Sequence, residues 1–271
     1  MSRSIRDLPD ATERWSEISE QLAGRRPAIF LDFDGTLAPI VEDPDAATLP
    51  DLTRAALQRL RDHCPVTVMS GRDAEDVRDR VGIDGLVYAG SHGFDVIWPD
   101  GRRRQRGVEF QDSLRAAEVQ LHQEIADIPG AALEPKRFAV ALHYRRVPGH
   151  RVPDTEAAIT RVVERFDDLR LTGGKQVFEL RPDLDWDKGR ALAWLLAELG
   201  LDGGDAVPVY LGDDLTDEDA FAALRAHGAG IAVVVQGEDD ARTTLGGYRV
   251  RDVPAAARLL VRLAETLDPD A

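Results

Sequence analysis

Hydrophobic residues along the first hundred positions follow two alternating patterns. Short unbroken apolar runs are typical of parallel strands that are covered on both faces. Between them, apolar residues recur every three or four positions, which is the period of an amphipathic helix. Gly24 and Gly82 each follow such a segment and are expected to end a helix. We predict helices over 10–24, 49–63 and 73–82, and strands over 27–33, 65–70 and 85–90.

The middle of the chain has a different pattern, with hairpin signals and isolated helices in place of strand-helix alternation. This arrangement is typical of an α+β module, and we predict such a module over 104–182. Within it we expect strands on either side of 99–101 and of Pro135, helices over 111–128 and 154–166, and a hairpin about Gly173 and Gly174.

Strand and helix alternate again after residue 182. The alternation on both sides of the module predicts an α/β fold, with a doubly wound parallel sheet formed by 1–103 and 183–271. We expect a helix over 187–200, strands over 207–214, 230–237 and 248–253, and a closing helix through Leu263.

The composition indicates a globular enzyme or binding protein. Asp and Glu number 49 against 34 Lys and Arg, which gives a net charge of −15. This balance argues against a broad surface for nucleic acid or an anionic membrane. The single cysteine, Cys64, cannot form an internal disulfide, and no stretch resembles a signal peptide or a membrane span. We expect a cytoplasmic monomer that meets any anionic substrate through a metal ion, a helix N-terminus or a few cations.

Two carboxylates, Asp32 and Asp34, follow the first predicted strand and precede Gly35. One interpretation is a hairpin, because Asp-Gly between apolar runs is a common turn signal. A hairpin would bury Asp32 within a paired strand, where a carboxylate without a partner is costly to desolvate. At the carboxyl end of a parallel strand, both residues would instead lie over the crevice where α/β sheets bind ligands. There they can share a hard cation and leave one carboxylate for chemistry.

A second acidic segment, 212–219, also follows an apolar strand. The alternative explanation is a helix N-terminus, with Thr216 and Asp219 as a capping pair and acids in the first turn. That explanation does not account for Asp213 and Asp214, which precede the cap. Carboxylates from both segments would repel each other in one crevice unless a cation lay among them, so we infer a Mg²⁺ site.

Two further segments could bind phosphate. Lys188 follows Asp187 at the start of a predicted helix, so its ammonium and the helix N-terminus would favour the same anion. A lone lysine of this kind is more often a solvated surface residue. The turn 70–72, with sequence Ser-Gly-Arg, offers a hydroxyl and a backbone N–H to phosphate oxygens. By itself this tripeptide is an ordinary strand-to-helix turn.

Taken in order, these segments resemble the four motifs of the haloacid dehalogenase (HAD) superfamily of phosphotransferases. The resemblance implies an HAD-like core, and it implies that the module 104–182 is a cap of the C2 type, a lid that closes over the site. The matching residues are "DFDGT" at 32–36, Ser70, Lys188, and "GDD" at 212–214 with Asp217.

The resemblance also implies a mechanism. Asp32 would attack phosphorus and form an aspartyl-phosphate. Asp34 would protonate the leaving oxygen and then activate the water that cleaves the intermediate. Mg²⁺ would be held by the Asp32 carboxylate, the Asp34 backbone carbonyl and Asp213, with direct or indirect support from Asp214.

Longer stretches are similar to the trehalose-6-phosphate phosphatase family. In that family two acids and a lysine of the cap bind the disaccharide hydroxyls, and the matching positions here are Glu134, Lys136 and Glu179. Such groups give directed, charge-assisted hydrogen bonds; ordinary strand-surface charge is the alternative explanation. The similar stretches are 88–96, 133–145, 177–182 and 212–221.

On the core side, the resemblance places Ser70 and Lys188 against the phosphoryl oxygens. One position departs from the family pattern, because Ser91 stands where many members have an acid before the histidine. His92 is present and is expected to line the site. The remaining substrate-binding positions are Thr36, Gly71 and Arg72.

The predicted function is Mg²⁺-dependent hydrolysis of trehalose 6-phosphate to trehalose and phosphate, the last step of trehalose biosynthesis. One alternative is another sugar-phosphate phosphatase with the same cap type, acting on sucrose phosphate, mannosylglycerate phosphate or a hexose phosphate. Another is a non-catalytic regulatory module with a phosphatase-like fold. The presence of Asp32, Asp34, Lys188 and Asp213 together argues against the regulatory module.

Overall fold

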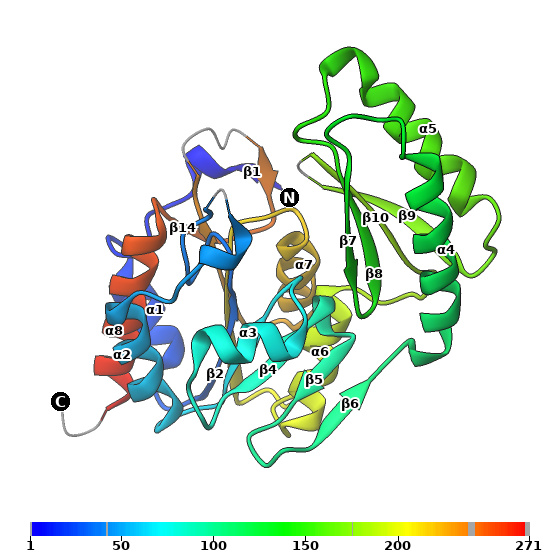
Figure 1. Ribbon diagram of the computed structural model, residues 1–271. Helices are drawn as coiled ribbons and strands as arrows, with labels where there is room; N and C mark the ends of the chain where they lie inside the picture. The colour runs from blue at the N-terminus through cyan, green and yellow to red at the C-terminus, as the bar shows by residue number, and fades with distance from the viewer. Residues whose placement is uncertain (1, 42, 175, 238–241, 269–271) are drawn as a thin grey trace. The chain divides into compact units, whose positions relative to one another are not determined.

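The chain folds into two compact units. The computed structural model describes residues 2–41, 43–174, 176–237 and 242–268. The core unit contains Met1–Arg104 and Trp186–Ala271, and the inserted unit contains Gln105–Asp185, drawn mostly in green in Figure 1. The mixed α/β architecture with a parallel sheet confirms the predicted fold class.

An eight-stranded sheet forms the centre of the core unit. Its strand order is β14-β12-β11-β2-β3-β4-β5-β6, and the six strands from β14 to β4 are parallel. β5 pairs with β4 in the antiparallel direction. Crossover helices between parallel neighbours produce this order. The strands are β2 (Arg26–Asp32), β3 (Val66–Met69), β4 (Val87–Gly90), β5 (Asp95–Ile97), β6 (Arg103–Gln105), β11 (Ala206–Gly212), β12 (Ile231–Val235) and β14 (Tyr248–Val250).

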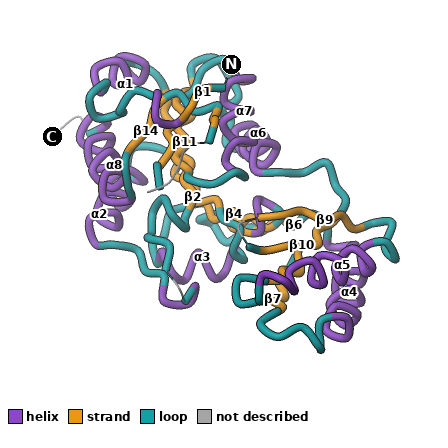
Figure 2. The backbone as a smooth tube through the Cα atoms, turned by 90° about the horizontal axis from the view of Figure 1, so that it is seen from above, coloured by secondary structure: helices purple, strands orange, loops and turns teal. Residues whose placement is uncertain are grey.

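Helices cover both faces of this sheet, which explains the unbroken apolar runs. In β2, Ile29 and Leu31 join the hydrophobic core under one helix layer, and Ala28 and Phe30 join the core under the other. Figure 2 shows the two layers on opposite sides of β2 and β11. One layer holds α1 (Trp15–Leu22), α2 (Asp51–Arg61), α3 (Ala74–Val81) and α8 (Val253–Leu267), and the other holds α6 (Lys188–Glu198) and α7 (Asp217–His227).

The inserted unit has one antiparallel sheet of order β7-β8-β10-β9. Two helices pack on one face and bury a core of their own, which includes Leu114, Leu142 and Leu180. Charged side chains, described below, occupy the other face. The elements are α4 (Gln111–Glu124), α5 (Val152–Val163), β7 (Ala132–Lys136), β8 (Ala139–His143), β9 (Leu169–Gly174) and β10 (Val177–Pro182).

Short elements complete the chain. β1 pairs with β13 near the N-terminus, and Ile5 is fully buried beside them. No helix in the described part of the chain combines the length and the apolar character that a membrane crossing needs. The short elements are β1 (Arg3–Ser4), β13 (Thr243–Thr244), and the 3₁₀ helices at Ile5–Asp7, Pro44–Ala46, Ser91–Gly93, Val108–Phe110 and Gly149–Arg151.

Two local predictions are wrong. The strands of the inserted unit are not split around Pro135, which lies inside β7 opposite Val140. β7 is an edge strand, so one side of its backbone needs no ladder hydrogen bond and proline is tolerated. The first helix begins at Trp15 rather than Asp10, because Asp10 pairs with Arg249 in a β-bridge.

Candidate active site

The carboxyl ends of β2 and β11 bring the two acidic segments to one edge of the sheet. The strands are parallel neighbours, with Leu31 opposite Leu211. Asp32 ends β2, and Asp213 directly follows β11. Side chains at these positions therefore meet over the same crevice, as expected for an α/β sheet.

Three carboxylates form a compact cluster at this edge. Oxygen atoms of Asp32, Asp213 and Asp217 all lie within 4.8 Å of one another. Asp32 is 5% exposed and Asp217 is fully buried. We call these three residues the acidic cluster. Burying several like charges so closely is costly unless cations offset them.

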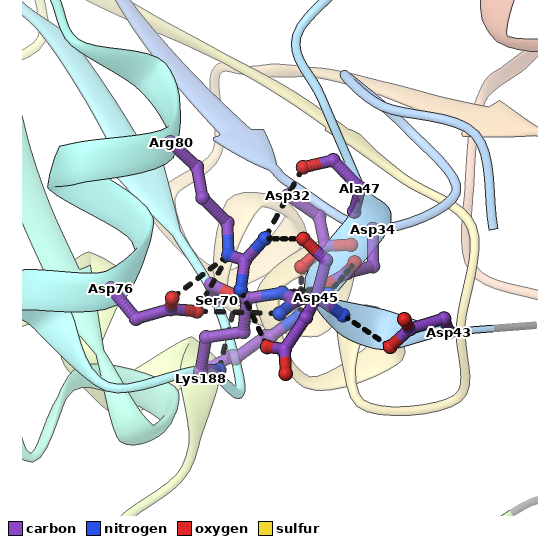
Figure 3. Close-up of polar contacts among 10 residues, drawn as sticks. Asp32, Asp34, Asp43, Asp45, Ala47, Ser70, Asp76, Arg80 and Lys188 are labelled. Atoms are coloured by element: carbon purple, nitrogen blue, oxygen red, sulfur yellow. Dashed lines mark hydrogen bonds and ion pairs between the residues drawn. The ribbon is translucent and has the colours of Figure 1, made fainter. Parts of the chain in front are cut away.

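Lys188 supplies one such cation. It is the first residue of α6, where Asp187 caps the helix by accepting a hydrogen bond from the backbone N–H of Arg190. Its Nζ lies 2.7 Å from Oδ1 of Asp32 and 2.7 Å from Oδ1 of Asp217, and the residue is 2% exposed. Figure 3 shows Lys188 beside Asp32 and Ser70. The lysine thus joins the cluster rather than the solvent.

The pKa values reflect burial first and an excess of negative charge second. Burial raises the pKa of Asp32 well above its usual range; Lys188 opposes this shift, while Asp217 and Asp213 add to it. Burial, followed by the charges of Asp217 and Asp214, raises the pKa of Asp213 to about 7. Burial alone would lower the pKa of Lys188, but Asp217 and Asp32 outweigh it and raise that pKa. Lys188 therefore stays charged, but its single positive charge does not balance the negative charge of the three carboxylates.

Asp214 lies outside the acidic cluster. Its exposed carboxylate accepts a hydrogen bond of 2.6 Å from the backbone N–H of Thr216, and its own N–H donates to Oδ2 of Asp217 at 2.9 Å. Thr216 precedes α7 but makes no side-chain capping bond, so the predicted Thr216–Asp219 capping pair is wrong. Asp217 instead turns its carboxylate inward to Lys188.

Glycine and threonine of the first segment shape the edge of the cluster. Gly35 has a φ of +82°, and a Cβ atom there would lie 2.2 Å from a carboxylate oxygen of Asp213. Only glycine allows the loop to pass this closely. The Thr36 hydroxyl donates to Oδ1 of Asp213 at 3.2 Å, so Thr36 contacts the acidic cluster directly.

The Ser-Gly-Arg turn is held by the segment that contains His92. The backbone N–H of His92 donates to the Ser70 carbonyl at 2.8 Å, and the N–H of Ser91 donates to the Arg72 carbonyl at 2.7 Å. Ser91 and His92 both have positive φ, 48° and 56°, which is uncommon for residues with side chains. A Cβ on Gly71 would lie 3.0 Å from the His92 ring. The turn at 70–72 and the turn at 91–92 therefore pack closely against each other.

Ser70 and Asp34 differ in their surroundings. Ser70 is buried, and its hydroxyl accepts a hydrogen bond from the backbone N–H of Arg72 at 3.1 Å. Asp34 is partly exposed and accepts two hydrogen bonds from the Arg72 guanidinium. The Ser91 hydroxyl donates to Asp73 at 3.0 Å, at the start of α3.

In the inserted unit, the three sequence-predicted residues lie on one face of the sheet. Lys136 donates to Glu179 at 2.8 Å, and Glu134 contacts His143 at 2.7 Å. Arg181 also donates to Glu179 at 2.8 Å. Glu179 is only 8% exposed, so this pair of cations stabilises a carboxylate that would otherwise be costly to bury.

Sequence reasoning missed several contributors. Asp217 was included in the fourth motif but given no position in the site, because first-turn acids are common at helix starts. Tyr210 donates its hydroxyl to Oδ1 of Asp217 at 2.7 Å, yet it reads as one more apolar residue of β11. Arg242 donates to the Asp213 carbonyl and to Glu218, and nothing in the sequence signals this contact.

Comparisons with known proteins identify the family of this chain. The family described as trehalose-phosphatase matches residues 30–254. A trehalose-phosphate phosphatase of Mycobacterium avium is 47% identical over 271 residues, covering 98% of this chain and 69% of the relative. The C-terminal domain of a Candida albicans trehalose-6-phosphate phosphatase shares the fold, with a TM-score of 0.78, 21% identity, and coverage of 95% of this chain and 98% of that one.

A phosphatase of the HAD superfamily from Bacteroides thetaiotaomicron also shares the fold. Its TM-score is 0.60 at 17% identity, with coverage of 90% of this chain and 96% of that one. The family match spans the acidic cluster, Lys188 and the inserted unit. The chain belongs to the trehalose-phosphatase family and is a phosphoric monoester hydrolase.

Proposed function

We propose that this protein hydrolyses trehalose 6-phosphate to trehalose and phosphate, with Mg²⁺ as its cofactor. The observation that carries the proposal is the contact of Lys188 with Asp32 inside the acidic cluster. Two relatives that are 47% identical over nearly the whole chain are named trehalose-phosphate phosphatases. Their named activity supports the same substrate here.

The acidic cluster fits a hard divalent cation. Its donors are carboxylate oxygens, which Mg²⁺ prefers, and one lysine faces three carboxylates. The cation would be held by Asp32, Asp213 and the Asp34 backbone carbonyl, with Asp217 or Asp214 in support. When bound, it would offset the charge of the nucleophile and of the phosphate.

Asp32 is the proposed nucleophile. Its carboxylate attacks phosphorus while the bond from phosphorus to the sugar oxygen breaks, and an aspartyl-phosphate forms. Lys188 fixes the orientation of Asp32 through the 2.7 Å contact with Oδ1. Ser70 and Lys188 bind the phosphoryl oxygens, with Gly71 in the same turn.

Asp34 is the proposed proton donor and acceptor. It gives a proton to the departing sugar oxygen, then takes one from the water that attacks the aspartyl-phosphate. The first transfer leaves Asp34 ionised, which is the form that accepts the proton of the water, and the second transfer returns Asp34 to its starting form. Hydrolysis of the acyl-phosphate releases phosphate and restores Asp32.

The inserted unit is proposed to act as a cap that recognises the sugar. Glu134, Lys136 and Glu179 share one sheet face and offer charged donors and acceptors to hydroxyl groups. His92 is proposed to contribute from the core unit.

A Mg²⁺-dependent substrate panel tests the proposed function. Phosphate release is measured for trehalose 6-phosphate, sucrose phosphate, mannosylglycerate phosphate and glucose 6-phosphate, with and without EDTA. We expect trehalose 6-phosphate to have the highest kcat/KM and EDTA to abolish turnover. A trehalose 6-phosphate value no higher than that of glucose 6-phosphate would reject the proposed substrate. No turnover of any phosphate ester would favour the regulatory alternative.

A further inference from the structure

A row of alternating charges runs from Asp34 away from the acidic cluster. Its members are Asp34, Arg72, Asp76, Arg80 and Asp45, and each contacts the next through hydrogen bonds. We call this row the charge chain. Figure 3 shows the contacts of Asp76, Arg80 and Asp45 in the same view as Asp34 and Asp32.

The contact between Arg72 and Asp34 uses both ends of the guanidinium fork. Nε donates to Oδ2 of Asp34 at 2.7 Å, and Nη2 donates to Oδ1 at 2.7 Å. A bidentate pair of this kind fixes orientation as well as distance. The Arg72 side chain is only 15% exposed, and its guanidinium lies over the ring of Phe33 at 5.7 Å. Both oxygens of Asp34 are therefore held by a side chain that is itself confined.

The remaining members of the charge chain anchor Arg72. Nη1 of Arg72 donates to Asp76 on α3 at 3.3 Å, and Asp76 accepts bonds of 2.8 and 2.9 Å from Nε of Arg80. Arg80 also donates to the carbonyls of Asp45 and Ala47 at 2.9 and 3.3 Å. The chain thus ties Asp34 to a helix and to the loop that follows the first motif.

The backbone of Arg72 is fixed as well. Its carbonyl accepts from Ser91 at 2.7 Å, and its N–H donates to the Ser70 hydroxyl at 3.1 Å. The guanidinium donates to two carboxylates, so its geometry suits holding Asp34 better than binding phosphate.

We propose that Arg72 is a positioning residue for proton transfer from Asp34 to the leaving oxygen. When Asp34 carries that proton, the protonated oxygen gives up its bond from the fork and faces the leaving oxygen, while the other oxygen keeps its bond from Arg72. The proposal rests on the proposed function only in assigning that proton transfer to Asp34. General acid catalysis depends on the proton donor lying within hydrogen-bond reach of the leaving oxygen. A carboxylate released from the fork would rotate among several positions and spend less time in that one.

The test uses aryl phosphates, because their leaving groups differ in how much they need a proton. Phenyl phosphate has a poor leaving group, whereas p-nitrophenyl phosphate has a good one. The measured quantity is kcat/KM, which reports phosphoryl transfer to Asp32. We expect R72Q and R72K to lower kcat/KM for phenyl phosphate by about 10- to 100-fold, and for p-nitrophenyl phosphate by less than about 3-fold. A structural role alone would not produce this selectivity.

A double variant tests whether Arg72 acts through Asp34 or independently of it. If Arg72 acts through Asp34, then R72Q added to D34N lowers kcat/KM for phenyl phosphate by no more than about 2-fold. The matched control is R78Q on α3, whose ion pair with Asp79 is largely exposed. Its kinetics should equal those of the wild type. R72K keeps the charge and serves as the test variant if R72Q fails to fold.

Several results would overturn the proposal. Equal losses on both esters, with weaker inhibition by inorganic phosphate, would make Arg72 a phosphate ligand. Unchanged or faster turnover of phenyl phosphate in both Arg72 variants, or a further large loss in the double variant, would also reject it. If D34N itself shows no selective loss on phenyl phosphate, the proton-donor role in the proposed function fails, and this proposal fails with it. A selective loss in D34N without one in R72Q rejects this proposal alone.

Discussion

Nζ of Lys188 lies 2.7 Å from Oδ1 of Asp32, although 156 positions separate the two residues in the sequence. Each residue is almost completely buried, and each has its pKa raised within the same cluster. The contact links the end of β2 to the start of α6, and Asp217 completes it from α7. The atoms that stabilise this buried contact are therefore also the ones to which the proposed mechanism assigns catalysis, and separate variants can test each role.

Replacing Lys188 by methionine should destabilise the metal-free protein. The substitution leaves the buried carboxylates of Asp32 and Asp217 without their cation, so we expect the free energy of unfolding at neutral pH to fall by about 3–5 kcal/mol. Urea unfolding in EDTA measures this change. Arg104→Met provides the control, because its pair with Glu198 is exposed and should contribute less than about 1 kcal/mol. A loss below about 1 kcal/mol for Lys188→Met would contradict the expectation.

Asp32→Asn should remove turnover while preserving the fold. Asparagine keeps the volume and can still accept a hydrogen bond from Lys188, but its amide is a very poor nucleophile. We expect kcat to fall by about 10⁴-fold or more, with an unchanged circular dichroism spectrum and cooperative unfolding. Residual activity near the wild-type level would show that Asp32 is not the nucleophile.

Asp213 should make the metal-free protein less stable as the pH rises. Its pKa in the folded protein is about 7, raised mainly by burial from an ordinary value of 3.8. Between these two values the folded state binds more protons than the unfolded state, so raising the pH through this window lowers the free energy of unfolding, by on the order of a few kcal/mol. Above pH 7 Asp213 is ionised in both states, and the folded state carries the full cost of burying its charge.

The comparison with Asp213→Asn isolates this contribution. Unfolding in EDTA at several pH values from 4 to 8 should show a steeper decline for the wild type than for the variant. Adding Mg²⁺ should stabilise the wild type more at pH 8 than at pH 5, because the ion binds the deprotonated carboxylate. Parallel pH profiles for the two proteins would count against the raised pKa.

Glu179→Gln should impair recognition of the sugar rather than of phosphate. The substitution keeps the volume but weakens the bonds to Lys136 and Arg181 and to any hydroxyl. We expect kcat/KM for trehalose 6-phosphate to fall by about 10- to 100-fold, with a raised KM, and that for p-nitrophenyl phosphate to change little. Glu156→Gln, on the exposed surface of α5, is the control. Equal losses on both substrates would place Glu179 outside sugar recognition.

The sequence predicted the sheet that positions the site because its strands are apolar on both faces. A short unbroken apolar run such as 27–33 is typical of a buried parallel strand. The parallel order then places the residues that follow β2 and β11 at one edge of the sheet. Pro135 misled the prediction because its tolerance depends on β7 being an edge strand. The strand order that makes β7 an edge is not visible in a local pattern.

Side-chain partners were harder to predict than positions. The acids near 32 and 213 follow strands, so their meeting could be inferred from topology. Asp217 instead reaches Lys188 by turning inward from the first turn of α7, while Asp214 turns toward Thr216. Which of several adjacent carboxylates turns inward depends on packing, for example on the close approach of Gly212 to Asp217. The spacing of residues along the sequence does not show which carboxylate turns inward.

The pairing of β2 with β11 affects how the protein folds during its synthesis on the ribosome. A ribosome makes Asp32 early and Asp213 and Asp217 late, with the whole inserted unit translated between them. The acidic cluster of a nascent chain therefore cannot form until β11 and α7 have left the exit tunnel. Until then β2 lacks β11, its neighbour on one side of the sheet. Truncated products of translation would carry the first motif yet possess no working hydrolase.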